Sequence, residues 1–428
     1  MLTADSKLYA SNSRNMLAGA IGNAIEFYDF MIYAYLAPFF AVQFFPSYDP
    51  VTGLIATYGG FAAGMLMRPI GGILIGTIGD RIGRALALQL TVLLISVPTF
   101  LIGLLPGYGI IGIWAPILLV LMRMVQGISL GGEYSAAVVF LVERSPPDQR
   151  GFSGSFSPLG AVLGFFLGSA VVFLCVSVVS PVAMYDWGWR IPFLASVLLT
   201  FIGFYIRSRI SPDAKKAPEE LPSSPAFESI TQHWREMLTM ALANAVAGVV
   251  GFVGFMYVVT WSVTEAGIPH ALALVVNLLS LLLCGVFVLL AGKLSDHIGW
   301  RKTAMTGAAI SLFGSWPAFI LLKTGNVTWM LIGSTIIALA HAMFTGPFCA
   351  CIASLVPRRV RVTVIAFGYS SSMAVFGGLS PMLTEYLVGR IGFSMAPALV
   401  ISGGAMISLL TLILHPLWRQ SVNKFPED

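Results

Sequence analysis

Long apolar stretches, separated by short polar ones, run along the whole of the 428-residue chain. They are continuous rather than alternating, which disfavours a β-barrel, and about 20 apolar residues in a helix are enough to cross a bilayer. We therefore predict an all-α integral membrane protein with twelve transmembrane helices. The predicted spans are residues 17–41, 52–78, 85–105, 112–142, 152–180, 189–208, 237–264, 270–292, 303–322, 327–356, 363–389 and 394–417.

A repeated motif divides these spans into two sets of six. The sequence GTIGDRIGR begins at residue 76, after span 2, and GKLSDHIGWRK begins at residue 292, after span 8. Their aspartates, Asp80 and Asp296, are 216 residues apart, and Arg150 and Arg361, after spans 4 and 10, are 211 residues apart. A repeat that keeps its orientation in the membrane is typical of transporters built from two parallel six-helix bundles.

The polar stretch between spans 6 and 7 is rich in proline, serine and charge, which predicts a linker. We assign residues 1–206 to an N-terminal six-helix bundle, 207–235 to a cytoplasmic linker and 236–428 to a C-terminal six-helix bundle.

Basic residues set the predicted orientation. Of the 24 Lys and Arg residues, 19 fall on the side that holds both termini, three on the other side and two inside spans. Basic loops stay on the cytoplasmic side of a membrane. We predict a multi-pass protein of the plasma membrane, the inner membrane of a bacterium, with both termini cytoplasmic.

Composition excludes several classes of function. Charged residues make up 10% of the chain, against about 25% in soluble domains, and the mean hydropathy is +0.86. The net charge of +5 indicates no nucleic-acid partner. The four cysteines lie in apolar runs and the five histidines are scattered, so we predict no metal site. Without an ATP-binding loop or a clustered nucleophile and base, the chain is predicted not to be an enzyme.

The fourth span carries polar residues that a lipid-facing surface would reject. They are Arg123, Gln126 and Glu133. A charge at membrane depth costs about 3 kcal/mol or more, so such groups usually face a partner or a water-filled cavity. Small residues recur at every fourth position over 127–135, which leaves a smooth face that a second helix can approach closely. These features indicate a moving part beside a pathway.

Two acids in the first span are candidates for proton coupling. Glu26 and Asp29 share a helix face, with Tyr33, a candidate for the substrate site, one turn further. Two carboxylates this close in a low dielectric cannot both ionise cheaply, so one should hold a proton. Together with Glu133 they form the predicted proton-coupling set. The alternative is a structural ion pair with Arg68 or with the arginine of span 4.

Arg123 lies roughly 15 Å along the helix axis from Glu133 and cannot pair with it. Its planar guanidinium can bind a substrate carboxylate, and a permanent ion pair with Asp29 or Glu26 is an equal alternative. Gln126 is a further candidate for the cavity, or forms an interhelical hydrogen bond. Arg68-Pro69 falls in the inner half of span 2, where proline can bend a helix, and we predict a structural or gating role for both.

The second half offers aromatic candidates instead of cations. Tyr257, Trp261 and Tyr369 could line a cavity or could simply pack, and Glu385 falls near the outer end of its span, where solvent can reach it. No Lys or Arg lies at the midplane of spans 7 to 12. A di- or tricarboxylate would need more than one cation, so this inventory favours a zwitterion or a singly charged acid.

Five motifs in order carry a family resemblance. GNAIEFYDF (22–30), RPIGG (68–72), RMVQGISLGGE (123–133), RGF (150–152) and GWRIPF (188–193) resemble the metabolite:proton symporter family of the major facilitator superfamily, and the loop at 76–84 resembles the superfamily signature. The family includes proline/betaine, α-ketoglutarate, citrate and shikimate permeases. The resemblance covers the N-terminal half densely and the second half more thinly.

The resemblance implies a cytoplasmic gate, a proton as the coupling ion and Asn23 in the substrate site. The gate residues would be Asp80, Arg81, Gly83, Arg84, Glu143, Arg150, Asp296 and Arg301. The chain departs from the pattern at Ala85 and Trp300, which replace basic residues. Ser157-Pro158 and Tyr369-Ser370 stand where many relatives have Gln and Asn, and these two departures bear on the substrate.

We therefore predict a secondary active transporter that imports a small polar organic solute with protons by alternating access. A zwitterion such as proline or betaine, or a small organic acid, fits best. The alternatives are a di- or tricarboxylate symporter, a solute exchanger and, more remotely, a channel. The predicted partners are the solute and the lipid bilayer, no cofactor is expected beyond the proton gradient, and the chain is expected to work as a monomer.

Overall fold

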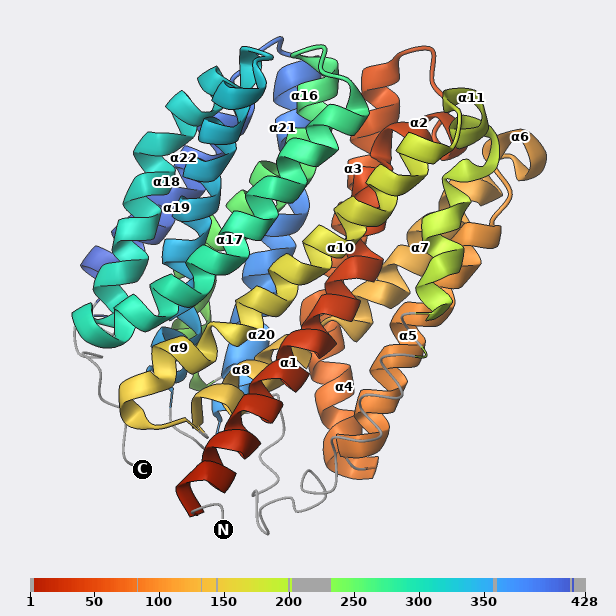
Figure 1. Ribbon diagram of the computed structural model, residues 1–428. Helices are drawn as coiled ribbons and strands as arrows, with labels where there is room; N and C mark the ends of the chain where they lie inside the picture. The colour runs from red at the N-terminus through yellow and green to blue at the C-terminus, as the bar shows by residue number, and fades with distance from the viewer. Residues whose placement is uncertain are drawn as a thin grey trace.

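The described part of the chain is helical and contains no strand. The computed structural model describes residues 4–82, 84–131, 133–143, 145–198, 201, 232–356, 360–415 and 418. Figure 1 shows the long helices running alongside one another, with α2, α6, α11 and α16 at one end and α4 and α9 toward the other. Most of the predicted linker, 207–235, lies outside the described residues.

The first half is built from short and long helices. They are α1 (Ala4–Tyr35), α2 (Ala37–Phe44), α3 (Pro50–Leu66), α4 (Arg68–Ile82), α5 (Arg84–Leu104), α6 (Tyr108–Ile111), α7 (Trp114–Ser129), α8 (Glu133–Glu143), the 3₁₀-helix η1 (Pro147–Gln149), α9 (Arg150–Gly154), α10 (Phe156–Val178), α11 (Pro181–Ala183), the π-helix η2 (Met184–Gly188) and the helical residues 190–198.

The second half contains the longest unbroken helices. Its elements are α14 (Trp234–Ala243), α15 (Ala245–Val249), the π-helix η4 (Val250–Tyr257), α16 (Val258–Thr264), α17 (His270–Ile298), α18 (Trp300–Lys323), α19 (Val327–Ala353), α20 (Arg361–Ser372), the π-helix η5 (Met373–Gly378), α21 (Leu379–Gly389) and α22 (Ala396–Leu414).

Each of the twelve predicted spans corresponds to helix. Among the described residues, eight helical stretches are long and apolar enough to cross a membrane, and Ala20–Tyr35 with Ala37–Phe44, bent by 62°, makes a ninth. The other three spans correspond to the shorter stretches Leu90–Leu104, Trp114–Ser129 and 190–198. The twelve-helix fold class is confirmed.

Several spans that we predict as continuous are interrupted, among them spans 4 and 2. Span 4 divides into α7, which ends at Ser129, and α8, which begins at Glu133. The sequence has consecutive glycines at 131 and 132, and glycine costs about 1 kcal/mol relative to alanine inside a helix. Span 2 is interrupted at Met67, directly before Arg68-Pro69, as proline leads one to expect.

The smooth face predicted for span 4 is confirmed. A Cβ atom added to Gly127 would overlap the carbonyl oxygen of Gly64, and one added to Gly131 would overlap that of Arg68. Small residues let two helix backbones approach this closely inside a membrane. Helix α7 is therefore held directly against α3 and the start of α4.

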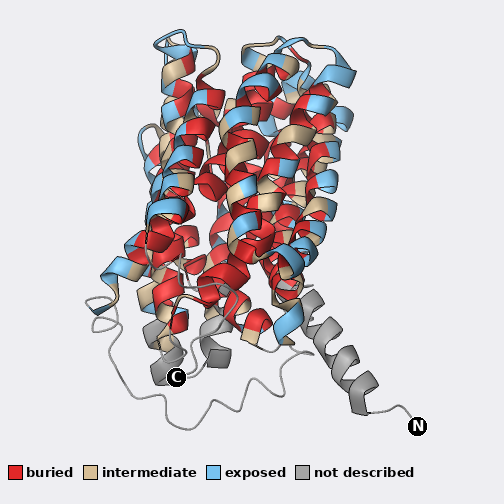
Figure 2. Ribbon diagram, turned by 90° about the vertical axis from the view of Figure 1, so that its left-hand side faces the viewer, coloured by how far each residue is buried: buried red, intermediate tan, exposed pale blue. Residues whose placement is uncertain are grey.

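Buried residues gather between the helices and exposed ones on the outer surface (Figure 2). The outer surface is apolar, with exposed side chains such as Leu174, Phe201 and Phe313. Soluble proteins rarely expose extensive apolar surface, so this surface suits a lipid environment. Inside, α10 packs against α17, α3 against α21 and α4 against α20, and these pairs join the two halves.

Candidate functional site

Asp296 joins the two halves at the end of the bundle that carries α9. Its carboxylate accepts hydrogen bonds from the backbone N–H groups of Gly151 (2.7 Å) and Phe152 (2.8 Å), and its Oδ1 also accepts one from Trp300 Nε1 (3.2 Å). Asp296 belongs to α17 and the two N–H groups to α9. The aspartate of the second signature loop is thus tied to the loop after span 4.

A second contact at the same end pairs Arg361 with Glu143. Arg361 Nη1 lies 2.5 Å from Glu143 Oε1. Arg361 is fully buried, and the Glu143 side chain is 32% exposed. The predicted gate does not include Arg361, although Arg361 corresponds in the repeat to Arg150, which the predicted gate does include. We call Asp296, Glu143 and Arg361 the inner latch.

The other predicted gate residues divide into two groups. Arg301 donates from Nε and Nη2 to the carbonyl oxygen of Leu412 near the end of α22, so it stays within the second half, and Arg150 begins α9. Gly83 and the side chains of Asp80, Arg81, Arg84 and the coupling candidate Glu133 lie outside the described residues.

At the opposite end, Arg390 of the second half binds the loop before α3. Its Nη2 lies 2.7 Å from Asp49 Oδ2, and it also donates to Thr52 Oγ1. Both charged side chains are exposed to solvent. The hydrogen bond from Thr52, together with the Val51 N–H and Arg390, lowers the pKa of Asp49. Sequence alone gave no signal for this outer latch, Asp49 and Arg390.

An aromatic contact lies between the inner latch and the centre. The rings of Tyr134 and Tyr369 stack with centroids 4.4 Å apart, and Tyr134 Oη lies 3.8 Å from Cys349 Sγ. Arg68 is buried 5.9 Å from the ring centroids of both Tyr369 and Phe27. Tyr134 comes from the first half and Tyr369 from the second, so this stack also closes the interface.

Arg123 lies in an aromatic cage at the centre of the first half. Its Cζ is 3.9 Å from the ring centroid of Phe30, 4.3 Å from that of Tyr33 and 5.6 Å from that of Phe61. Its Nη1 donates to Gln126 Oε1 at 2.8 Å. A guanidinium over aromatic faces is stabilised electrostatically. Among the described residues no carboxylate lies within salt-bridge distance of Arg123, so this buried cation can bind an anionic group.

Tyr33 and Gln126 hold that cage in place. Tyr33 Oη donates to the carbonyl oxygen of Thr57 (2.8 Å), and Gln126 Nε2 donates to Thr99 Oγ1 (2.7 Å). Both side chains are fully buried. The hydrogen bond that we gave as the alternative for Gln126 is therefore present, together with its contact to the arginine.

Each acid of the first span lies in electrostatic range of one arginine. Asp29 is within range of Arg123, and Glu26 is within range of Arg68. Asp29 is 1% exposed, and neither of its carboxylate oxygens has a hydrogen-bond partner among the described residues. Burying an ionised carboxylate without hydrogen bonds is costly, so this group is poised to take up a proton or a positive partner.

The two departures from the family pattern occur at contacts. Asn23 Nδ2 donates to Ser157 through both the hydroxyl (2.9 Å) and the backbone carbonyl (3.2 Å). Ser370 Oγ donates to the Gly131 carbonyl oxygen across the halves at 3.0 Å, beside the Tyr369 stack. Both departures thus lie on helices that pack against α1 or the α7–α8 break.

In the second half, Glu385 is buried. It is 4% exposed, and its Oε2 accepts a hydrogen bond from Tyr257 Oη at 2.9 Å. Our expectation that solvent reaches it is wrong, because α3 of the first half packs over α21. Tyr257 also packs edge-on against Tyr58, with centroids 5.5 Å apart, and Tyr58 Oη donates to Thr260 across the halves at 2.8 Å.

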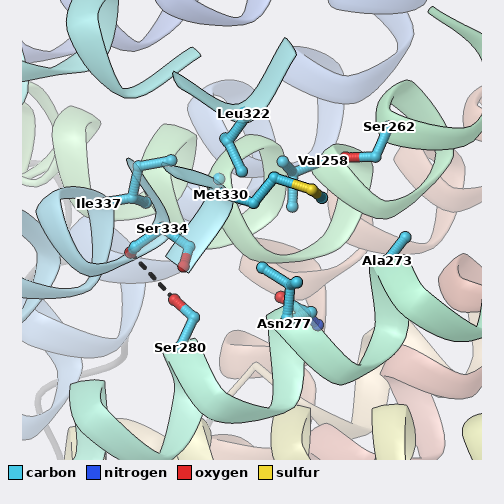
Figure 3. A pocket seen from close by; sticks show the side chains of 11 residues that line it. Val258, Ser262, Ala273, Asn277, Ser280, Leu322, Met330, Ser334 and Ile337 are labelled. Carbon is cyan, nitrogen blue, oxygen red and sulfur yellow. Dashed lines mark hydrogen bonds between the residues drawn. The ribbon is translucent and has the colours of Figure 1, made fainter. Parts of the chain in front are cut away.

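Trp261 packs within its own half. Its Nε1 donates to the Ser394 carbonyl oxygen (2.9 Å) and its ring lies 5.1 Å from that of Phe319. Nearby, α16, α17 and α19 enclose a small space beside Asn277, with room for about one water molecule. Figure 3 shows this space and the hydrogen bond from Ser280 to Ser334 beside it. It is too small for an organic solute.

The contacts described so far close both ends of the interface between the halves. The inner latch joins them at one end and the outer latch at the other. Asn277 Nδ2 adds hydrogen bonds to Tyr35 and Ser169 of the first half at 3.2 and 3.3 Å. Among the described residues, the two halves are therefore in contact at both ends, and Arg123 and Asp29 are buried between these ends.

Comparison with protein families gives one match over most of the chain. The model of the Major Facilitator Superfamily matches residues 19–381. The chain is 32% identical to the proline/betaine transporter of Escherichia coli K12 over 92% of its own length and 81% of the relative. It is equally 32% identical to the ectoine/proline transporter of Corynebacterium glutamicum, over 92% and 82%.

Two further comparisons cover nearly whole chains. An inner membrane metabolite transport protein of E. coli K12 is 33% identical over 96% of both proteins. Among solved structures, the xylose transporter from E. coli in a partially occluded inward-open conformation superposes with a TM-score of 0.71. It is 16% identical and covers 95% of this chain and 98% of its own. At that identity, the structural match concerns the fold alone.

Proposed function

The chain belongs to the major facilitator superfamily and is a transporter, not an enzyme, and we propose that it imports a small zwitterion with protons by alternating access. In this proposal the two halves rock around the centre, and the inner and outer latches open in turn. Breaking either latch alone would expose the centre to one side of the membrane.

The observation that carries this proposal is the buried pair Asp29 and Arg123. The carboxylate has no hydrogen-bond partner among the described residues and the guanidinium is caged by rings rather than by a carboxylate. Arg123 is thereby free to bind a solute carboxylate. When it does, its attraction for Asp29 weakens, and Asp29 should bind a proton. Solute and proton would then load together.

Two facts support a zwitterion as the solute. The similar transporters of E. coli and C. glutamicum carry proline, betaine or ectoine in their names. Among the described side chains of the first half, the fully buried arginines are Arg123 and Arg68, and Arg68 is engaged by the rings of Phe27 and Tyr369. One available cation suits one carboxylate.

A dicarboxylate is the second candidate. It would need Arg68 as well, and two nitrogens of that guanidinium, Nε and Nη1, have no hydrogen-bond partner among the described residues. A dicarboxylate would therefore have to separate Arg68 from the Tyr369 ring.

Proteoliposome uptake under an imposed inward pH gradient tests the proposal. The panel is glycine betaine, proline, α-ketoglutarate, citrate and shikimate, each with and without an uncoupler. We expect uncoupler-sensitive accumulation of betaine or proline. Accumulation of a dicarboxylate alone would replace the zwitterion by the second candidate, and movement only by exchange with internal solute would refute symport.

We also propose that the monomer is the functional unit and that both termini are cytoplasmic. Both ends of the transport path lie within one chain, between its two halves, so a second copy is not required. The inner latch then faces the cytoplasm, in agreement with the 19 basic residues assigned to that side. If a reagent outside intact cells labelled a single cysteine added near either terminus, the proposed orientation would be wrong.

A further inference from the structure

We propose that Glu385, Tyr257 and Tyr58 form the binding site for the positively charged nitrogen of the zwitterion, opposite the carboxylate site at Arg123. The inference rests on the proposed function, because it assumes a zwitterionic solute. These residues would bind the positive end of the solute, for which the proposed function assigns no site.

The charges around Glu385 favour a positive ligand. Its carboxylate is 4% exposed, and a neutral hydroxyl, that of Tyr257, is its hydrogen-bond donor. A further acid, Glu265, lies within electrostatic range. Among the described residues, no basic side chain forms an ion pair with Glu385. A buried carboxylate needs a cation or a proton, so this region attracts positive charge.

An aromatic surface lies beside Glu385. Tyr257 and Tyr58 are fully buried and meet edge to face at 5.5 Å. Aromatic faces bind ammonium groups, and quaternary ammonium groups in particular, which cannot donate hydrogen bonds. A carboxylate together with two tyrosine rings therefore suits a substituted ammonium better than it suits a metal ion.

Access of a solute to Glu385 depends on a contact between the two halves. Tyr58 belongs to α3 of the first half, whereas Thr260, its hydrogen-bond acceptor, belongs to α16 of the second. Separation of the halves on the side of the outer latch would break this bond and uncover Glu385. Tyr257 ends the π-helix η4, and π-helical segments are frequent at functional sites. Helix α21, which carries Glu385, directly follows the π-helix η5.

Helix α3 connects this site to Arg123. Tyr33, whose ring lies over the guanidinium, donates its hydroxyl to the carbonyl oxygen of Thr57, the residue before Tyr58 in α3. Helix α3 therefore lies against the arginine site through Thr57 and against the Glu385 site through Tyr58, whose ring packs on Tyr257. A small molecule that carries both charges can contact both ends once the halves part.

The test compares glycine betaine with 3,3-dimethylbutyrate, in which carbon replaces the charged nitrogen at nearly the same shape. Each compound competes for exchange of labelled betaine in proteoliposomes without a pH gradient, so proton coupling does not affect the readout. For the wild type we expect betaine to compete at least about tenfold better. For Glu385→Gln we expect this preference to fall at least about tenfold, with competition by dimethylbutyrate changed less than about twofold.

Ring variants provide an independent measurement if Glu385→Gln fails to fold. Tyr58→Leu should lose the preference for betaine and Tyr58→Phe should keep most of it, since the ring and not the hydroxyl faces the cation. The matched control is Tyr386→Leu, which removes an exposed ring, 49% accessible, from the same helix as Glu385.

Three outcomes would overturn the inference. One is an unchanged preference for betaine in both Glu385→Gln and Tyr58→Leu. Another is a Glu385→Gln variant that keeps the preference but no longer accumulates betaine uphill, because Glu385 would then carry the proton. The third is a wild type that exchanges betaine but does not prefer it to 3,3-dimethylbutyrate. A wild type that moves no zwitterion at all refutes the proposed solute class instead.

Discussion

Arg361 Nη1 lies 2.5 Å from Glu143 Oε1, and this pair joins the two halves at the inner latch. The arginine is fully buried while the glutamate is partly exposed. Removing one partner of a fully buried pair costs about 3–5 kcal/mol because the other charge is left uncompensated. The exposure of Glu143 reduces this amount, so we assign the pair about 1–3 kcal/mol of bias toward the state closed on the inside.

Glu143→Gln should therefore favour opening toward the cytoplasm. The reporter is native Cys349, which is 2% exposed beside Tyr134 in the closed state. In a background without the other three cysteines, alkylation of Cys349 from the cytoplasmic side should be about tenfold faster in the variant. The exchanged pair Glu143→Arg with Arg361→Glu should restore slow labelling. Equal labelling rates in wild type and Glu143→Gln would show that the pair does not hold the inner side closed.

Asp29→Asn should uncouple solute movement from protons. The amide matches the carboxylate in shape but cannot take up a proton, so betaine should no longer accumulate above its external concentration under a pH gradient. Exchange of betaine across the membrane should persist, because Arg123 keeps its cage. Uphill accumulation by the double variant Glu26→Gln, Asp29→Asn would contradict proton coupling at these acids.

The sequence predicted the fold because its main determinant is local. Lipid forces every spanning backbone into helix, so each apolar run of sufficient length predicted an element, and the basic residues predicted its direction. The glycines of span 4 could be interpreted for the same reason, since a smooth face has one main use inside a membrane. The breaks at Met67 and near Gly131 were harder to place, because they depend on how neighbouring helices cross.

The candidate site was predictable in the first half and poorly so in the second. Arg123 and Asp29 are charges in apolar runs, so they were conspicuous in the sequence. Glu385 was equally conspicuous, but its burial depends on α3, which is more than 300 residues away in sequence. The pair of Asp49 and Arg390 could not be predicted at all, because it joins two polar loops that have no pattern in common.

The outer latch should not contribute to the pH dependence of uptake between pH 5 and 8. Hydrogen bonds from Thr52 and Val51, with Arg390 nearby, hold the pKa of Asp49 below its ordinary 3.8. A lowered pKa means that the carboxylate stays charged above that value and loses the pair only as the pH falls through it. Asp49→Asn should therefore change the rate of uptake but leave the midpoint of its pH profile in place. A shifted midpoint would mean that Asp49 titrates in the working range.

Salt should act on the two latches differently. Both side chains of the Asp49–Arg390 pair are exposed, whereas Arg361 of the inner latch is fully buried. Exposed pairs are screened at a Debye length of about 8 Å in physiological salt, and buried ones much less. Raising external NaCl should therefore speed labelling of a cysteine placed under the outer latch in the wild type and not in Asp49→Asn. Equal acceleration in both would assign the effect to another contact.

Gly127→Ala should destabilise the first half, because its added Cβ has no room. It would meet the carbonyl oxygen of Gly64, which belongs to the backbone of α3 and cannot rotate away. Overpacking of this kind typically costs about 1–3 kcal/mol. Gly403→Ala is the matched control: this glycine lies within α22 with nothing inside 4 Å of its Cβ position. There alanine should be neutral or stabilise by up to about 1 kcal/mol, since it restricts the unfolded chain. Thermal unfolding in detergent should separate the two variants, with a lower Tm for Gly127→Ala. If both had the wild-type Tm, the close contact between α7 and α3 would not contribute to stability.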